Sequence, residues 1–157
     1  MMHLRIYPIV SILIWSLACG SFCKAQNETM KVRSVVDRLF AAMQEGDSAK
    51  AHAVFSDHAQ LTSLSYDKKD SLIISTHPVS GFIKAIGTPH QEKWIEKIYN
   101  VSISVDGPMA TVWAPYKFYL DDRYLHCGVN AIQLLKTMAG WKITEITDTR
   151  RKENCPD

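Results

Sequence analysis

The residues best suited to proton transfer lie in the last third of the sequence. His126 is the strongest candidate, because an imidazole ionises near neutral pH and can give or take a proton. Asp148 is the expected carboxylate partner, since the two residues fall on adjoining predicted strands. Such a pair in a half-apolar cavity could abstract an acidic C–H or promote a dehydration. It could also satisfy two buried polar groups without any turnover, and both interpretations stay open.

Side-chain alternation divides the strand that carries His126 into two faces. One face has His126 and Asn130 near one end and apolar residues at the other, the gradient expected from a pocket mouth to a core. We therefore predict that this face lines the pocket, with Gly128 admitting a ligand or a neighbouring ring. The opposite choice, with Cys127 in the cavity, stays open because one bulge would reverse the faces.

Aromatic and basic residues nearby are candidates for ligand contacts. Tyr116 and Phe118 fall on the more apolar face of the preceding strand, and Trp113 is a further aromatic candidate. Arg150 could hold a ligand carboxylate or phosphate in a forked contact, or form an ordinary salt bridge. Core or dimer-interface packing is the alternative for each aromatic residue. The predicted ligand-binding set is Trp113, Tyr116, Phe118, His126, Asn130 and Arg150.

Other kinds of site find little support. The remaining histidines show no metal-ligand spacing, so we expect no metal and no cofactor. Glycine-rich phosphate loops and the Gly-x-Ser-x-Gly motif are missing from the sequence. Eighteen basic residues against sixteen acidic ones leave no strong nucleic-acid footprint. The 157 residues, 46% hydrophobic and 22% charged, suit one globular domain and argue against wholesale disorder.

The first 25 residues are typical of a secretory signal peptide. A positive charge precedes an apolar run of about a dozen residues, followed by small residues before Gln26. A membrane span needs about 20 residues, so we expect no stable membrane insertion after processing. Cleavage after Ala25 would give a secreted or periplasmic protein. Lipidation at Cys19 is the alternative, although the usual leucine three residues earlier is replaced by Ser16.

Removal of residues 1–25 leaves two cysteines, Cys127 and Cys155. Two cysteines in an oxidising compartment suggest one disulfide bond. The spacing does not prove the bond, and a buried free Cys127 with an idle Cys155 is the alternative. We expect the polar tail, residues 151–157, to be mobile unless Cys155 is tied down.

The periodicity predicts helices first and strands afterwards. A helix is expected from Thr29 to Gly46, a shorter one from Asp47 or Ser48, and a third over residues 78–87. Four strand segments follow, with turns between them, at residues 92–105, 109–120, 123–137 and 140–149. Segregated helices and strands define an α+β fold, here N-terminal helices packed against a curved antiparallel sheet in a cone-shaped roll.

Four stretches resemble the nuclear transport factor 2-like superfamily. They are residues 112–119 (Val-Trp-Ala-Pro-Tyr-Lys-Phe-Tyr), 126–130 (His-Cys-Gly-Val-Asn), 140–143 (Gly-Trp-Lys-Ile) and 148–151 (Asp-Thr-Arg-Arg). The nearest subgroup comprises secreted bacterial proteins with SnoaL-like or lumazine-binding labels, although no residue here specifically recognises a pteridine. The resemblance implies one domain over residues 26–150, a conical pocket and frequent homodimers, without assigning an activity.

Three functions therefore compete. The first is an exported protein that binds an unknown, partly aromatic small molecule in the cone, without catalysis. The second is an isomerase, dehydratase or cyclase that uses His126 with Asp148 or Tyr116 for acid–base chemistry. The third is an interaction module that associates through the outer face of the sheet.

Overall fold

The computed structural model describes the backbone of residues 9–156 and the side chains of residues 26–156. The predicted signal peptide, residues 1–25, lies outside the residues with described side chains. The helices are α1 (Ile9–Glu45), α2 (Ser48–Val54) and α3 (Val79–Gly87). The strands are β1 (Phe55–Tyr66), β2 (Leu72–Pro78), β3 (Trp94–Ile98), β4 (Ser102–Asp106), β5 (Met109–Leu120), β6 (Arg123–Thr137) and β7 (Gly140–Thr149).

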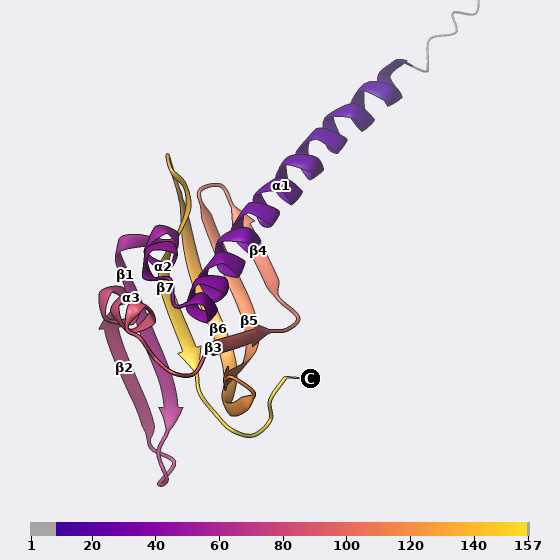
Figure 1. Cartoon of the computed structure of the whole chain (residues 1–157). Coiled ribbons are helices and arrows are strands. Elements are labelled where there is room, and N and C mark those ends of the chain that lie inside the picture. Colours follow the sequence, from indigo (N-terminus) through magenta and orange to yellow (C-terminus); the bar gives the residue numbers. More distant parts are fainter. Residues whose placement is uncertain (1–8, 157) are drawn as a thin grey trace, which may run out of the picture.

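The strands form a single curved sheet in the order β2-β1-β7-β6-β5-β3, and β4 also pairs with β5. The predicted α+β fold, with N-terminal helices packed on a curved sheet, is confirmed (Figure 1). One pairing departs from an all-antiparallel sheet, because β1 runs parallel to β7. A parallel pair requires a long crossover, and here almost the whole domain separates the two strands.

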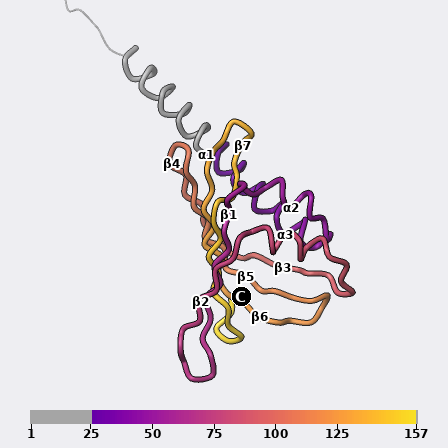
Figure 2. Tube along the Cα trace, turned by 90° about the vertical axis from the view of Figure 1, so that its left-hand side faces the viewer, coloured from indigo at the N-terminus to yellow at the C-terminus, as the bar shows by residue number. Residues whose placement is uncertain are grey.

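The core lies between α1 and the inner face of the sheet. Figure 2 shows the described helices on one side of the sheet, with the ends of β3, β5 and β6 curling toward them. Val32, Val35, Val36 and Leu39 are at most 2% exposed, which confirms the apolar stripe expected from their spacing. Burial of these side chains against the sheet stabilises the helix far more than its intrinsic propensity does.

The helix α1 begins at Ile9, so the predicted start at Thr29 was wrong. No proline and only Gly20 interrupt the sequence from Ile9 to Glu45, and nothing local ends the helix there. A polar contact then fastens α1 to the sheet. The Glu28 carboxylate accepts a hydrogen bond from Trp141 Nε1 at 2.9 Å and also pairs with Lys136 at 2.9 Å.

The predicted strand over residues 92–105 is two strands, β3 and β4, separated at residues 99–101. Both pair with β5, on either side of Pro115. In an antiparallel strand the backbone N and C=O of one residue point toward the same neighbouring strand. Pro115 can therefore accept a hydrogen bond from the β3–β4 side but cannot donate one, because proline has no N–H. The break falls where β5 cannot donate, and the Pro115 carbonyl accepts from Tyr99 N at 2.8 Å.

Gly128 permits the end of β7 to cross close to β6. A Cβ at this position would lie 1.7 Å from the carbonyl oxygen of Thr149 and 2.9 Å from Cε1 of Tyr116. The predicted close approach of a ring is confirmed, and a backbone carbonyl approaches as well. Neither strand can move away freely, because both are held in the sheet by their own hydrogen bonds.

We predict that Gly128→Ala destabilises the fold by at least ~2 kcal/mol, because the clash with a backbone atom cannot be relieved by a rotamer change. Urea unfolding followed by circular dichroism measures the effect. Gly81→Ala is the matched control, since a Cβ at Gly81 in α3 meets nothing within 4 Å and alanine favours a helix. Equal stability of Gly128→Ala and the parent protein would contradict the close-approach explanation.

Candidate functional site

A cavity of about 440 Å³ lies between the helices and the inner face of the sheet. Large aromatic side chains from four different elements form much of its wall. They are Phe40 of α1, Phe82 of α3, Trp94 of β3 and Phe118 of β5. A cavity of this size and apolar character suits a small organic molecule.

A larger hollow of about 640 Å³ lies between α1 and β4 but is more open to solvent. It is lined by Arg33, Asp37 and Arg38 among others, and the Arg33–Asp37 pair is already satisfied at 2.8 Å. The smaller cavity is the stronger candidate, because it is more enclosed and several polar groups converge at one end of it.

Strand register brings these polar groups together. Ser63, Asp148 and Asn130 lie side by side across β1, β7 and β6. A second row crosses β3, β5 and β6 and consists of Glu96, Phe118 and His126. Alternation puts the ring of Tyr116 between the two rows, where Gly128 leaves room for it. Residues distant in the sequence therefore share one end of the cavity.

Asp148 is the centre of the hydrogen-bond network, and it is only 8% exposed. Its Oδ1 accepts from Ser63 Oγ at 2.5 Å, and its Oδ2 accepts from Arg150 Nε at 2.8 Å. The Tyr116 hydroxyl is 3.2 Å from the same Oδ2. A buried carboxylate is tolerated only when charged and polar partners compensate for lost water, and these three groups do so.

His126 and Asp148 form no hydrogen bond with each other, so the predicted direct pair was wrong. The Tyr116 hydroxyl bridges them instead, at 3.3 Å from His126 Nδ1 and 3.0 Å from the carbonyl oxygen of Thr149. When Tyr116 donates its one proton to Asp148 or Thr149, its oxygen can accept from His126 Nδ1–H. Register is the reason, because Asp148 is paired with Asn130, four residues further along β6.

Burial changes the proton affinities of the ionisable groups around Tyr116. It is the main cause that lowers the pKa of His126, the Arg150 charge adds to it, and Asp148 opposes it. It also raises the pKa of Tyr116, with the Asp148 charge as the second cause. Burial is the largest single influence on the Arg150 guanidinium and works against its charge, but the hydrogen bond to Asp148 and the charges of the neighbouring groups together outweigh it and raise the Arg150 pKa. His126 is therefore neutral at pH 7, while Arg150 stays charged.

Glu96 is the functional candidate that the sequence analysis missed. Its Oε1 accepts a hydrogen bond from Asn130 Nδ2 at 2.6 Å, and Asn130 is itself 5% exposed. Burial raises the pKa of Glu96 to about 7, and the nearby Asp148 charge adds to the shift. The available signal was the alternation over residues 94–98, which puts this acid on the same face as Trp94.

Most of the predicted site residues meet at the cavity. Those that line it are Tyr116, Phe118, His126, Asn130, Asp148 and Arg150. Trp113 does not line it, because alternation continues unbroken through Pro115 and leaves its side chain 57% exposed on the outer face. The prediction for Trp113 as a cavity residue was therefore wrong. Cys127 also points away from the cavity, as the chosen face for His126 requires.

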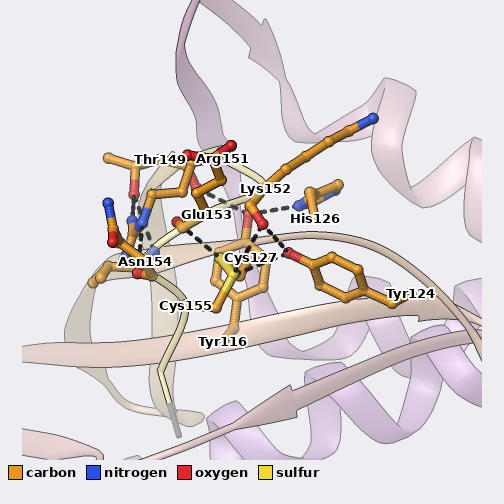
Figure 3. The surroundings of a disulfide bond; sticks show 11 residues. Tyr116, Tyr124, His126, Cys127, Thr149, Arg151, Lys152, Glu153, Asn154 and Cys155 are labelled. Atoms are coloured by element: carbon orange, nitrogen blue, oxygen red, sulfur yellow. Dashed lines mark hydrogen bonds between the residues drawn. A yellow bond between two sulfur atoms is a disulfide. The ribbon is translucent and has the colours of Figure 1, made fainter.

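Cys127 and Cys155 form a disulfide bond, with their Cα atoms 5.7 Å apart. Figure 3 shows the tail crossing β6 beside this bond, where Cys127 and Arg151 also exchange backbone hydrogen bonds at 2.8 and 2.9 Å. The Arg150 backbone N donates to the carbonyl of Leu64 at 2.8 Å. The tail is therefore tied down, and the segment carrying Arg150 is anchored on both sides.

Among the described residues, no group of three or more His, Cys, Asp or Glu side chains could hold a metal ion. Most of the cavity's polar groups form hydrogen bonds with one another. The chemistry that this arrangement permits is therefore proton transfer and hydrogen bonding by Glu96, Tyr116 and His126.

No protein-family model and no curated protein matches this sequence. Solved structures do match, and one with a TM-score of 0.69 is a nuclear transport factor 2-like protein with a cystatin-like fold from Novosphingobium aromaticivorans. This chain has the nuclear transport factor 2-like fold. That match is 10% identical and covers 87% of this chain and 90% of the other.

Two further nuclear transport factor 2-like structures agree. A protein of unknown function from Shewanella baltica is 17% identical, with a TM-score of 0.59, over 81% of this chain and 96% of its own. A proposed dehydratase of the nuclear transport factor 2-like family, from Streptomyces avermitilis, is 13% identical with a TM-score of 0.61. The match covers 80% of this chain and 97% of the dehydratase. At these identities the comparison shows the fold alone.

Glu96→Gln should stabilise the protein at pH 8. The pKa of Glu96 is raised from 4.5 to about 7 in the folded state, so the folded protein favours the protonated carboxyl. The stability that this gives is fully present below pH 4.5 and is lost as the pH rises through 7, whereas an uncharged glutamine does not lose it. Each pKa unit corresponds to ~1.4 kcal/mol, so the gain is on the order of 3 kcal/mol at pH 8 and absent at pH 4. Urea unfolding at both pH values measures it.

The matched control is Glu92→Gln, which changes a glutamate on the surface whose side chain is 45% exposed. We expect no comparable pH-dependent gain from this variant. If Glu96→Gln had the same stability as the parent at both pH values, the Glu96 carboxyl would not be desolvated as described.

Proposed function

We propose that this protein binds a small, partly aromatic molecule in the cavity between its helices and its sheet. The observation that carries the proposal is the division of the cavity into an aromatic wall and a polar end, where Glu96 and Asn130 meet. Such a division holds the body of a ligand by apolar contact and fixes its orientation by a few polar groups. The nuclear transport factor 2-like fold supports this function without naming the ligand.

Acid–base catalysis on the bound molecule is the second candidate. The specific observation in its favour is the pKa of about 7 for Glu96, which would allow this carboxyl to accept and return a proton near neutral pH. The solved dehydratase-like relative has the same fold, which is analogy only. Chemical conversion of the bound molecule by the parent protein, and its loss in Glu96→Gln, would distinguish catalysis from binding.

We also propose that the chain is exported as a secreted or periplasmic protein after cleavage at Ala25. The signal-like sequence of residues 1–25 and the Cys127–Cys155 disulfide support export, because disulfides persist in oxidising compartments. Lipidation at Cys19 is the alternative route to the cell envelope. Among the described residues, no helix is long and apolar enough to cross a membrane.

A homodimer is the partner arrangement that we propose for this chain. Met109, Trp113 and Leu135 are each 46% to 57% exposed, and the strand register puts them on the outer face of β5 and β6. Exposed apolar groups of this kind are common at protein interfaces. A monomeric mass in sedimentation analysis would count against the dimer.

Trp94→Ala should weaken binding in the cavity at least about tenfold, because burial of an aromatic side chain contributes ~1.5–3 kcal/mol. The neutral fluorescent probe N-phenyl-1-naphthylamine measures this, since its emission rises in an apolar site. Trp113→Ala is the matched control, because it removes the same side chain from the outer face. Equal loss of binding in both variants, or no binding by the parent protein, would refute the cavity as the binding site.

Intact-mass measurement of the exported protein tests the proposed processing. We expect a chain that begins at Gln26 and is about 2 Da lighter than its reduced form, because each of the two thiols loses its hydrogen when the disulfide forms. A chain that begins at Cys19 with added acyl mass would favour the lipoprotein alternative. Retention of residues 1–25 would refute both forms of processing.

A further inference from the structure

We propose that the cavity selects molecules that present a hydrogen-bond donor on an uncharged or positively charged group, with Glu96 as the receiving residue, and disfavours anions. This inference rests on the proposed binding function and specifies the ligand's chemistry. It replaces the expectation that Arg150 would receive a ligand carboxylate or phosphate.

One carboxylate oxygen of Glu96 has no partner among the described residues. Glu96 Oε1 accepts from Asn130 Nδ2 at 2.6 Å, but Oε2 has no hydrogen-bond partner in the described part of the chain. In that same part, every buried side-chain nitrogen or oxygen has a partner, so an oxygen without one must be accessible. Glu96 is only partly buried and lines the cavity, so Oε2 is open to it.

Asn130 supplies a second acceptor beside the first. Its Nδ2 is committed to Glu96, which fixes the orientation of the amide and leaves Oδ1 as an acceptor. Oδ1 makes no hydrogen bond to a described residue, and since no buried polar side-chain atom among those residues lacks a partner, Oδ1 is open to the cavity that Asn130 lines. Because the two free atoms are both acceptors, a ligand group that only accepts would leave them unsatisfied.

The charges of the site work against an anionic ligand. Arg150 is already paired with Asp148, at 2.8 Å through Nε and 3.5 Å through Nη2, so the two charges compensate each other. Burial and the Arg150 charge lower the pKa of His126, which is therefore neutral at pH 7. An ionised Glu96 is then the one unpaired charge among these groups. An anionic ligand would meet two carboxylates and one occupied cation in a low-dielectric cavity.

The aromatic wall of the cavity would contact the body of the ligand. The ring of Trp94 meets Phe118 edge to face, with centroids 6.4 Å apart, and both rings line the cavity beside Glu96. Phe40 and Phe82 contribute further apolar surface from the helices. A compact aromatic group with a short polar arm matches this arrangement.

Three probes of matched shape test the proposal. They are 2-(1-naphthyl)ethylamine, 2-(1-naphthyl)ethanol and 1-naphthylacetate, which are cationic, neutral and anionic at pH 8. In isothermal titration calorimetry of the parent protein we expect the amine to bind tightest and the acetate at least about tenfold more weakly than the alcohol. Glu96→Gln should cost the amine about tenfold in affinity and change the alcohol by less than about twofold.

The affinity of the parent protein for the probes at two pH values provides a second readout. Amine affinity should fall from pH 8 to pH 5.5 as Glu96 is protonated, whereas the affinity for the alcohol should change little. Asp148, Arg150, His126 and Tyr116 are the other ionisable groups around Glu96. Since His126 is also ionisable and lines the same cavity, the pH dependence must disappear in Glu96→Gln if Glu96 causes it.

The outcomes separate the two proposals. If 1-naphthylacetate binds most tightly in the cavity, or the amine keeps its affinity and pH dependence in Glu96→Gln, the inference about ligand charge is overturned and cavity binding stands. If none of the three probes binds the parent protein, both proposals fail. Circular dichroism of Glu96→Gln confirms that the comparison is made on folded protein.

Discussion

The Asp148 carboxylate is the constraint on which the site depends. A nearly buried charge must be compensated, and Ser63, Tyr116 and Arg150 compensate it from three different strands or their ends. These contacts fix the position of the Tyr116 hydroxyl and, through it, the orientation of His126. Loss of any one partner would leave buried polar atoms unsatisfied, so the residues of this network act as a unit.

The cavity exists because the ends of β3, β5 and β6 curl toward the helices and enclose a space beside α1 (Figure 2). Two local features of the strands permit this shape. Pro115 lies where β3 ends and β4 begins, and Gly128 lets the end of β7 pass close to β6. The disulfide then ties the tail to β6 behind the cavity. The result is an apolar space that the core side chains leave unfilled, with one polar end.

The chemistry at that end depends on two groups with different environments. Asp148 is balanced by Arg150, whereas the neighbouring Glu96 has only the amide of Asn130 as a hydrogen-bond partner in the described part of the chain. The difference leaves one carboxyl with a raised pKa and an unused oxygen inside a largely aromatic space. The proposed binding of a donor-bearing molecule and the alternative of proton transfer both rest on this asymmetry.

Local sequence patterns determined the last three strands to the residue, the buried stripe of α1 and the face of β6 that carries His126, because periodicity and turn residues act over short distances. The tertiary structure decided the contacts between strands. It replaced the expected His126–Asp148 pair with a bridge through Tyr116, turned Trp113 outward and brought Glu96 to Asn130 from 34 residues away. Register and the curl of the sheet set those distances, and both depend on how all the strands pair, which no short segment encodes.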